Sequence, residues 1–196
     1  MASVRSSDQF PNQLLDREQV ERIRQLLSVA NLEIHLKREW GSRAPDHRES
    51  IHSEVKKKMA HAYPLSDSSI SHCQSMGGFV FAQQEINQIF QIGFDIEEFS
   101  RIKPQVARRI CQSDQEFEEA PSPASLWTAK EAAFKSLKGP HQPATVSELE
   151  LAAWTQIDSQ TETVKIKYPK KYSLHSALGL IIKKNEFSLA FFICHP

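Results

Sequence analysis

The sequence has few cysteines, no net charge and no long apolar run. Its three cysteines are far apart and lack C-x-x-C spacing, which argues against a disulfide framework and against a structural zinc site. The 24 basic residues equal the 24 acidic ones, so the chain lacks the broad positive charge of many nucleic-acid-binding proteins. No apolar run approaches the roughly 20 residues needed to cross a bilayer, and the first residues lack the apolar core of a signal peptide. We therefore expect a cytoplasmic protein that binds neither nucleic acid nor membrane.

The apolar periodicity predicts an α+β fold, because helical and strand patterns occur in separate runs instead of alternating. Asp16 is the expected cap of the first helix, which Asn31 could interrupt. Residues 1–13 are polar and are expected to fray. Helices are expected at residues 16–40, 53–62, 104–111 and 122–137, and loops at 41–49 and 65–78. Strands are expected at 79–82, 89–96, 146–154, 161–167, 176–183 and 187–194, with hairpin turns at 85–87 and 183–186.

Residues 125–135 are the most informative segment, because they place acidic and basic side chains on one short helix. Trp127, Glu131 and Lys135 are spaced four apart and share one side of that helix, while Lys130 lies on the adjacent ridge. The helix can therefore present an acid and a base to the same ligand. The alternative is an ordinary surface ion pair between Glu131 and Lys135, which contributes a few tenths of a kcal/mol.

A pair of acidic residues lies on the expected strand at 89–96 and its continuation. Apolar residues alternate there with polar ones, so that Asp95 and Glu97 point the same way. Two carboxylates on one strand face repel each other unless a proton or a cation relieves them, and Mg²⁺ prefers such oxygen ligands. Gly93, on the same face, would let a ligand approach the backbone. The alternative is a polar strand end that simply faces water.

These residues carry a family resemblance. Gly93-Phe-Asp-Ile-Glu97, followed about thirty residues later by Trp127-Thr-Ala-Lys-Glu-Ala-Ala-Phe-Lys135, resembles the paired signature of 4′-phosphopantetheinyl transferases. Upstream, Ser69-Ile-Ser-His72 is similar to the Ile-Ser-His motif of the Sfp-type branch. The resemblance covers about residues 66–196, and the first sixty residues carry no matching motif. It implies transfer of the phosphopantetheine arm of coenzyme A to a serine of an apo acyl or peptidyl carrier protein, with release of adenosine 3′,5′-bisphosphate.

The resemblance also implies roles for individual residues, and these roles suit the reaction. Asp95, Glu97 and Glu131 would hold Mg²⁺, or Mn²⁺, against the coenzyme A pyrophosphate. Lys130 and Lys135 would bind the pyrophosphate and stabilise charge on it during transfer. Glu131, or a metal-bound water that it orients, would accept the proton of the serine hydroxyl.

Coenzyme A phosphates are expected to contact residues further upstream. His72 and Ser71 would bind one of them, although a lone loop histidine is usually incidental. One lysine of residues 56–58, represented by Lys57, would meet the 3′-phosphate. The alternative for this charge run is a solvated helix face, and the chain lacks the Gly-Lys-Pro-like turn that the family commonly has here. Glu116 is the expected counterpart of the glutamate in the family's Phe-Ser-x-x-Glu run, which shapes the contact with the carrier.

The resemblance implies a monomeric pseudo-dimer of two similar α+β halves with coenzyme A between them. Residues 1–85 would form a reduced N-terminal half, and 86–196 the half that carries the metal site. Two other functions stay open, namely a non-catalytic module that binds coenzyme A or a carrier protein, and another metal-dependent phosphotransferase. The absence of G-x-x-x-x-G-K-[ST] and of kinase motifs argues against two classes of the latter. Finally, six lysines and no acid between residues 165 and 184 either protect strand edges or steer an acidic carrier.

Overall fold

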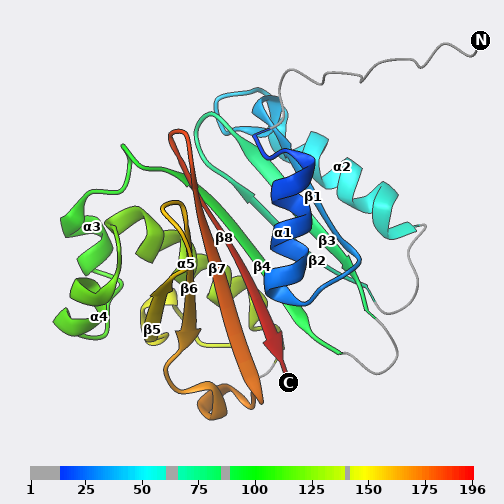
Figure 1. Ribbon diagram of the computed structural model, residues 1–196. Helices are drawn as coiled ribbons and strands as arrows, with labels where there is room; N and C mark the ends of the chain where they lie inside the picture. Colours follow the sequence, from blue (N-terminus) through cyan, green and yellow to red (C-terminus); the bar gives the residue numbers. More distant parts are fainter. Residues whose placement is uncertain (1–13, 61–65, 85–88, 140–141) are drawn as a thin grey trace, which may run out of the picture.

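The computed structural model describes residues 14–60, 66–84, 89–139 and 142–196, and its described part is α+β with two antiparallel sheets (Figure 1). The expected frayed segment 1–13 and the turn at 85–87 lie outside the described residues. None of the helices in the described ranges combines the length and apolar character needed to cross a bilayer.

The smaller sheet has the strand order β1-β3-β2, and the larger has the order β4-β8-β7-β6-β5. The strands of the smaller sheet are β1 (Leu32–Lys37), β2 (Ser66–His72) and β3 (Gly77–Gln83). Those of the larger sheet are β4 (Gln91–Glu98), β5 (Leu151–Gln156), β6 (Thr161–Ile166), β7 (Ser176–Lys184) and β8 (Phe187–His195). The α-helices are α1 (Arg17–Leu27), α2 (His47–Ala60), α3 (Pro104–Arg108), α4 (Asp114–Glu119) and α5 (Pro123–Ser136). Single turns of 3₁₀ helix are η1 (Arg38–Trp40), η2 (Val146–Glu148) and η3 (Pro169–Tyr172).

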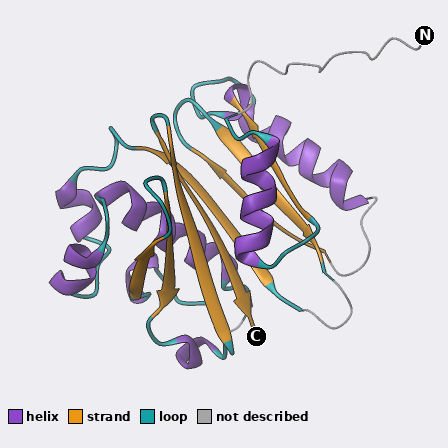
Figure 2. Ribbon diagram, in the orientation of Figure 1, coloured by secondary structure: helices purple, strands orange, loops and turns teal. Residues whose placement is uncertain are grey.

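Alternation along the strands divides the apolar residues among three cores. One core lies between the two sheets and under α1, and it takes Ile92, Phe94 and Ile96 from β4. The opposite face of the larger sheet packs against α5 through small residues of that helix. A smaller core around Trp40 and Phe79 lies between α2 and the smaller sheet. Figure 2 shows the resulting layers, with strands between α1 and α5 and with α2 beside the smaller sheet.

The two sheets meet along β2 and β4 through side chains. The backbone N–H of Ile92 donates to Asp67 Oδ2 at 2.7 Å, and that of Phe94 donates to Ser69 Oγ at 3.0 Å. Lys138 Nζ closes the same contact through Asp67 Oδ1 at 2.5 Å. The alternating polar side chains of β2 thus satisfy backbone donors at the edge of β4. Ser71, the next residue of β2 on the same face as Asp67 and Ser69, therefore lies opposite Asp95.

Several local expectations are confirmed. Asp16 caps α1 in a capping box with Gln19, and Ser122 caps α5, whose bounds lie within one residue of the expected ones. The strands β6, β7 and β8 also occur where the pattern places them, and β7 pairs with β8 around the expected turn, where Asn185 has a φ of 53°.

Other expectations are wrong, each because a tertiary contact or a local cap overrides the pattern. The first helix stops at Ser28, which takes a left-handed C-cap at φ 56°, and residues 32–37 then form β1 instead of helix. The polar residues 66–72 form β2 instead of a loop, because their backbone pairs with β3 and their side chains form hydrogen bonds with β4. The expected hairpin of 79–82 with 89–96 does not form, since β3 pairs with β1 and β2, and β4 pairs with β8. The pattern also missed α4 and began α2 six residues late.

Candidate functional site

A cavity of about 540 Å³ opens at the junction of the two sheets, between α2, β2, β4 and α5. It collects nine polar or aromatic side chains from these four elements. They are Arg48 and His52 of α2, Ser71 and His72 of β2, Asp95 and Glu97 of β4, and Trp127, Glu131 and Lys135 of α5. The structure therefore brings the acidic pair of β4 together with Glu131 and Lys135 of α5, although these elements are far apart in the sequence.

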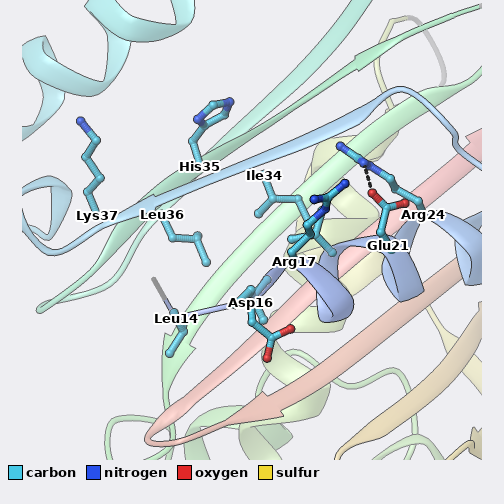
Figure 3. A pocket seen from close by; sticks show the side chains of 11 residues that line it. Leu14, Asp16, Arg17, Glu21, Arg24, Ile34, His35, Leu36 and Lys37 are labelled. Atoms are coloured by element: carbon cyan, nitrogen blue, oxygen red, sulfur yellow. Dashed lines mark hydrogen bonds and ion pairs between the residues drawn. The ribbon is translucent and has the colours of Figure 1, made fainter. Parts of the chain in front are cut away.

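A second cavity of about 440 Å³ lies between α1 and β1 (Figure 3). Acidic and basic groups line it together, and Glu21 pairs with Arg24 across one helical turn at 2.5 Å. Arg24 also donates its Nε hydrogen to Leu32 O at 2.8 Å, so this arginine has a structural partner on β1. The cavity at the sheet junction is therefore the better candidate for chemistry.

The face of α5 that lines the cavity is set by its close approach to β4. A Cβ atom placed on Gly93 would lie 1.8 Å from Ala132 O and 2.6 Å from Ser136 N. The absence of a side chain at Gly93 thus admits the helix, whereas the sequence had suggested that it admits a ligand; that expectation is wrong. The close contact holds Glu131 and Lys135 directly over the acidic face of β4.

Asp95 is the most constrained group in the cavity, with 4% of its surface exposed. Its Oδ1 accepts hydrogen bonds from Lys135 Nζ at 2.7 Å and from Ser71 Oγ at 2.6 Å. Its Oδ2 is buried and has no hydrogen-bond partner among the described residues. A buried carboxylate oxygen without a partner is costly, so Asp95 has an unused capacity to bind a cation or a donor.

The other two carboxyl groups of the cavity, those of Glu97 and Glu131, have raised pKa values. Burial raises the pKa of Glu97 to about 7; the charge of Arg101 opposes this shift, and that of Asp95 adds a smaller increase. Burial and the charge of Asp95 also raise the pKa of Glu131, which Lys135 opposes. Both shifts mean that the cavity disfavours three negative charges in the absence of a further positive one.

The donor set suits a hard divalent cation, although the side chains do not surround a common point. Within the described ranges, no three histidine, cysteine or acidic side chains form a cluster that could enclose a metal ion. Lys135 instead donates to Asp95. The free Oδ2 of Asp95 and the raised pKa values of Glu97 and Glu131 nevertheless fit a cation that prefers carboxylate oxygens.

The opposite part of the cavity is basic. The ring of His72 lies 4.9 Å from that of His47, measured between centroids, and both stand near the start of α2. Burial lowers the pKa of His72, as do the positive charges of His47, Arg48 and Lys135, while Asp95 raises it. Sequence analysis missed Arg48 and His52, because charged residues on an exposed helix give no signal of the cavity that they line.

Two expected ligand contacts lie outside this cavity. Lys57 is exposed, pairs with Glu54 at 2.9 Å and does not line the cavity. This agrees with the alternative interpretation of residues 56–58 as a solvated helix face. Lys130 is fully buried, and its Nζ donates to Glu116 Oε1 at 2.7 Å and to Leu149 O. The expectation that Lys130 faces a bound pyrophosphate is therefore corrected, because its ammonium group points into the interior on the side of α5 next to the one that lines the cavity.

Comparison with known protein families gives a match. Residues 91–192, more than half of the chain, match the family model described as the 4′-phosphopantetheinyl transferase superfamily. The match starts at the first residue of β4 and ends within β8, so that it includes all three carboxylates of the cavity. No curated protein matches the chain.

Proposed function

We propose that this chain, which belongs to the 4′-phosphopantetheinyl transferase superfamily, is an Sfp-type enzyme that transfers the 4′-phosphopantetheine arm of coenzyme A to a serine of an apo carrier protein. Adenosine 3′,5′-bisphosphate is the other product. The observation that carries the proposal is the cavity in which Asp95, Glu97 and Glu131 meet Lys135 and a basic cluster. A pyrophosphate substrate needs both features, because its charge must be neutralised and its position fixed.

Asp95, Glu97 and Glu131 are the residues that would hold Mg²⁺, or Mn²⁺. When bound, the ion supplies positive charge that neutralises pyrophosphate oxygens and fixes their orientation. The unpartnered Oδ2 of Asp95 and the raised pKa values of the two glutamates support this assignment.

The side chains of the cavity can supply the remaining parts of the reaction. The serine oxygen of the carrier forms a bond to the phosphorus that bears the pantetheine arm, and the bond from that phosphorus to the bridging oxygen breaks. Glu131, whose carboxylate lines the cavity, is the residue that would accept the serine proton. Lys135 stabilises the charge that develops on the phosphate oxygens. Its hydrogen bonds to Asp95 and Ser71 hold its ammonium group at the edge of the acidic face.

The basic part of the cavity would bind the adenosine end of coenzyme A. His72 and Ser71 stay in this role, since both line the cavity. Arg48 and His52 of α2 replace Lys57 as the proposed contacts of the 3′-phosphate, because they line the same cavity and Lys57 does not. An arginine suits a phosphate through its planar pair of donors.

The architecture that we propose is a monomeric pseudo-dimer of two α+β halves, a reduced one at residues 1–85 and a complete one at 86–196. Support comes from the position of the cavity at the junction of the two sheets. β2 of the smaller sheet contributes Ser71 and His72, while β4 and α5 of the larger one contribute the carboxylates. Neither sheet contains the whole set of proposed groups.

The proposal is tested by incubating the protein with coenzyme A, Mg²⁺ and a panel of apo carrier proteins, and by measuring the intact mass of each carrier. Substitution of Asp95, Glu97 or Glu131 by alanine should each lower turnover at least about 100-fold, because one ligand of a shared cation is lost. Glu98→Ala is the matched control, since Glu98 lies on the same strand but bonds to Ser75. Near-normal turnover in both Asp95→Ala and Glu131→Ala would refute the mechanism, and binding of coenzyme A without any transfer would indicate a binding module instead.

A further inference from the structure

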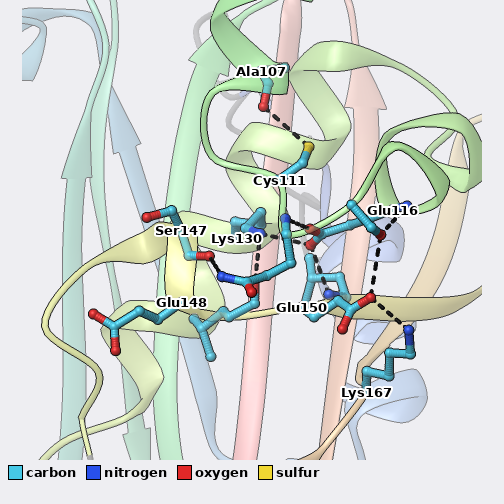
Figure 4. A network of polar contacts seen from close by, with 12 residues as sticks. Ala107, Cys111, Glu116, Lys130, Ser147, Glu148, Glu150 and Lys167 are labelled. Carbon is cyan, nitrogen blue, oxygen red and sulfur yellow. Dashed lines mark hydrogen bonds and ion pairs between the residues drawn. The ribbon is translucent and has the colours of Figure 1, made fainter.

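Lys130 forms an ion pair that is completely enclosed by protein (Figure 4). Neither its side chain nor that of Glu116 has any exposed surface, and their charged atoms are 2.7 Å apart. Lys130 Nζ also donates to Leu149 O. A buried charge is tolerated only where a partner compensates it, so the ammonium group is confined to this position.

Glu116 is itself held by three segments of the chain. Its Oε1 accepts a hydrogen bond from the backbone N–H of Leu151 at 2.8 Å in addition to that from Lys130, and its Oε2 accepts one from Gln112 N at 2.7 Å. Ser113 caps the short helix that carries it. Glu116 therefore connects the start of α4, the middle of α5 and the first residue of β5. Because the Glu116 carboxylate is held in this way, it fixes the direction in which the Lys130 side chain points.

The direction of Lys130 determines that of its neighbours on α5. Successive residues of an α-helix are about 100° apart, so an inward Lys130 turns Glu131 toward the adjacent side, with Lys135 one turn further along it. The opposite side of α5 is held by the close contact of Gly93 and by the 2.8 Å hydrogen bond between Thr128 and Ser188. The rotation of the helix is thus fixed from both sides.

We infer that Lys130 is a positioning residue, which acts through Glu116 to set the rotation of α5 and thereby aims Glu131 and Lys135 into the cavity. The inference rests on the proposed function for the role of these two residues. It differs from a direct contact between Lys130 and the substrate, because its effect passes through Glu116, which does not line the cavity.

The test compares Lys130→Met, Glu116→Gln and the double variant. Met keeps the length of the lysine stem and Gln keeps the shape of the glutamate, so the double variant leaves no uncompensated buried charge and should fold more stably than either single variant. Urea unfolding would identify conditions in which all variants are folded. We expect kcat to fall about 10- to 100-fold in each variant, with the KM for coenzyme A within about twofold of wild type. The loss in the double variant should resemble that in one single variant instead of the product of both.

Two results in this assay would overturn the inference. If Lys130→Met weakens coenzyme A binding in calorimetry while Glu116→Gln leaves it and kcat unchanged, Lys130 contacts the substrate. If the double variant regains wild-type kcat, the ion pair is only structural.

A titration with Mn²⁺ separates this inference from the proposed function. Because Glu131 would turn away from Asp95 and Glu97, Mn²⁺ affinity should fall at least about tenfold in all three variants, whether or not the wild type transfers a phosphopantetheine arm. Unchanged Mn²⁺ affinity would overturn the positioning role. Absence of transfer by the wild type, with reduced Mn²⁺ affinity in the variants, would instead overturn the proposed reaction alone.

Discussion

Glu97→Gln should stabilise the metal-free protein at alkaline pH, which is unusual for the loss of a charged group. The pKa of Glu97 rises from 4.5 to about 7 in the folded state, mainly through burial. Folding therefore favours the protonated carboxyl, and the stability that this provides is complete below about pH 4.5 and lost as the pH rises through 7. At about 1.4 kcal/mol per pH unit, the interval corresponds to roughly 3 kcal/mol. Because 13% of the side chain is exposed and water reduces the effect, we expect a gain of about 2 kcal/mol at pH 8.

The measurement is urea unfolding of wild type and Glu97→Gln at pH 5 and pH 8, with EDTA present. The free energies of unfolding should differ by about 2 kcal/mol at pH 8 and by much less at pH 5. Mg²⁺ should remove the difference at pH 8, because a cation that binds the charged carboxylates stabilises the wild type more. A variant that is equally or less stable than wild type at pH 8 would show that burial in the cavity does not disfavour the charged form of Glu97.

Glu98→Gln provides a matched control with the opposite sign. Burial raises the pKa of Glu98, but two hydrogen bonds from Ser75 act in the opposite direction. The net change in this pKa is downward. The stability that comes from charged Glu98 is present above the unfolded pKa and lost as the pH falls through the folded one. Glu98→Gln should accordingly destabilise the protein at pH 8.

Three further predictions concern packing, charge and the partner surface. Gly93→Ala should lower the free energy of unfolding by about 3 kcal/mol or more in urea, because the new methyl group would meet the α5 backbone 1.8 Å away; a loss below about 1 kcal/mol would contradict the close contact. Lys135→Ala should reduce kcat far more than Lys57→Ala, because only Lys135 reaches the acidic face of the cavity; the reverse order in steady-state kinetics would exchange their roles. Replacement of Lys170 and Lys171 by alanine should slow association with an acidic carrier at low salt, and an unchanged salt dependence of kcat/KM would show that the carrier docks elsewhere.

Lys167, which belongs to the same lysine-rich segment at residues 165–184, has a different role in the structure. Lys167 pairs with Glu150 at 2.6 Å, so that its charge is largely compensated within the protein. Any steering of a carrier by this segment would therefore depend on Lys170 and Lys171 more than on Lys167. Lys167→Ala is a suitable control for the double substitution.

The local elements of the site could be predicted because their patterns are short-range. Helix α5 follows from a serine cap and strong helix formers, and β4 follows from strict alternation of apolar and polar residues. The shared side of Glu131 and Lys135 and the shared face of Asp95 and Glu97 are consequences of helix and strand geometry. Motif spacing then led to the family that the comparison shows.

One error could have been avoided from the sequence. Lys130 is flanked one turn away by Leu126 and Ala133, and both are fully buried. Apolar neighbours at these spacings indicate the core-facing side of a helix. The motif drew attention to the charge of Lys130, whereas the periodicity indicated that the charge must find a buried partner. Glu116, fourteen residues earlier, is that partner.

The sequence by itself determined the type of most elements, the shared face of Asp95 and Glu97, and the shared side of Glu131 and Lys135, because these depend on the 2- and 3.6-residue periods of single segments. Tertiary structure alone decided that β2 is a strand, that it joins β4 through its side chains, and that Arg48 and His52 of α2 complete the cavity. These contacts join segments far apart in the chain, and no local period encodes which surfaces will meet. The pKa of Glu97 is a clear case, because its rise comes mainly from burial, which only the packing of other segments against β4 produces.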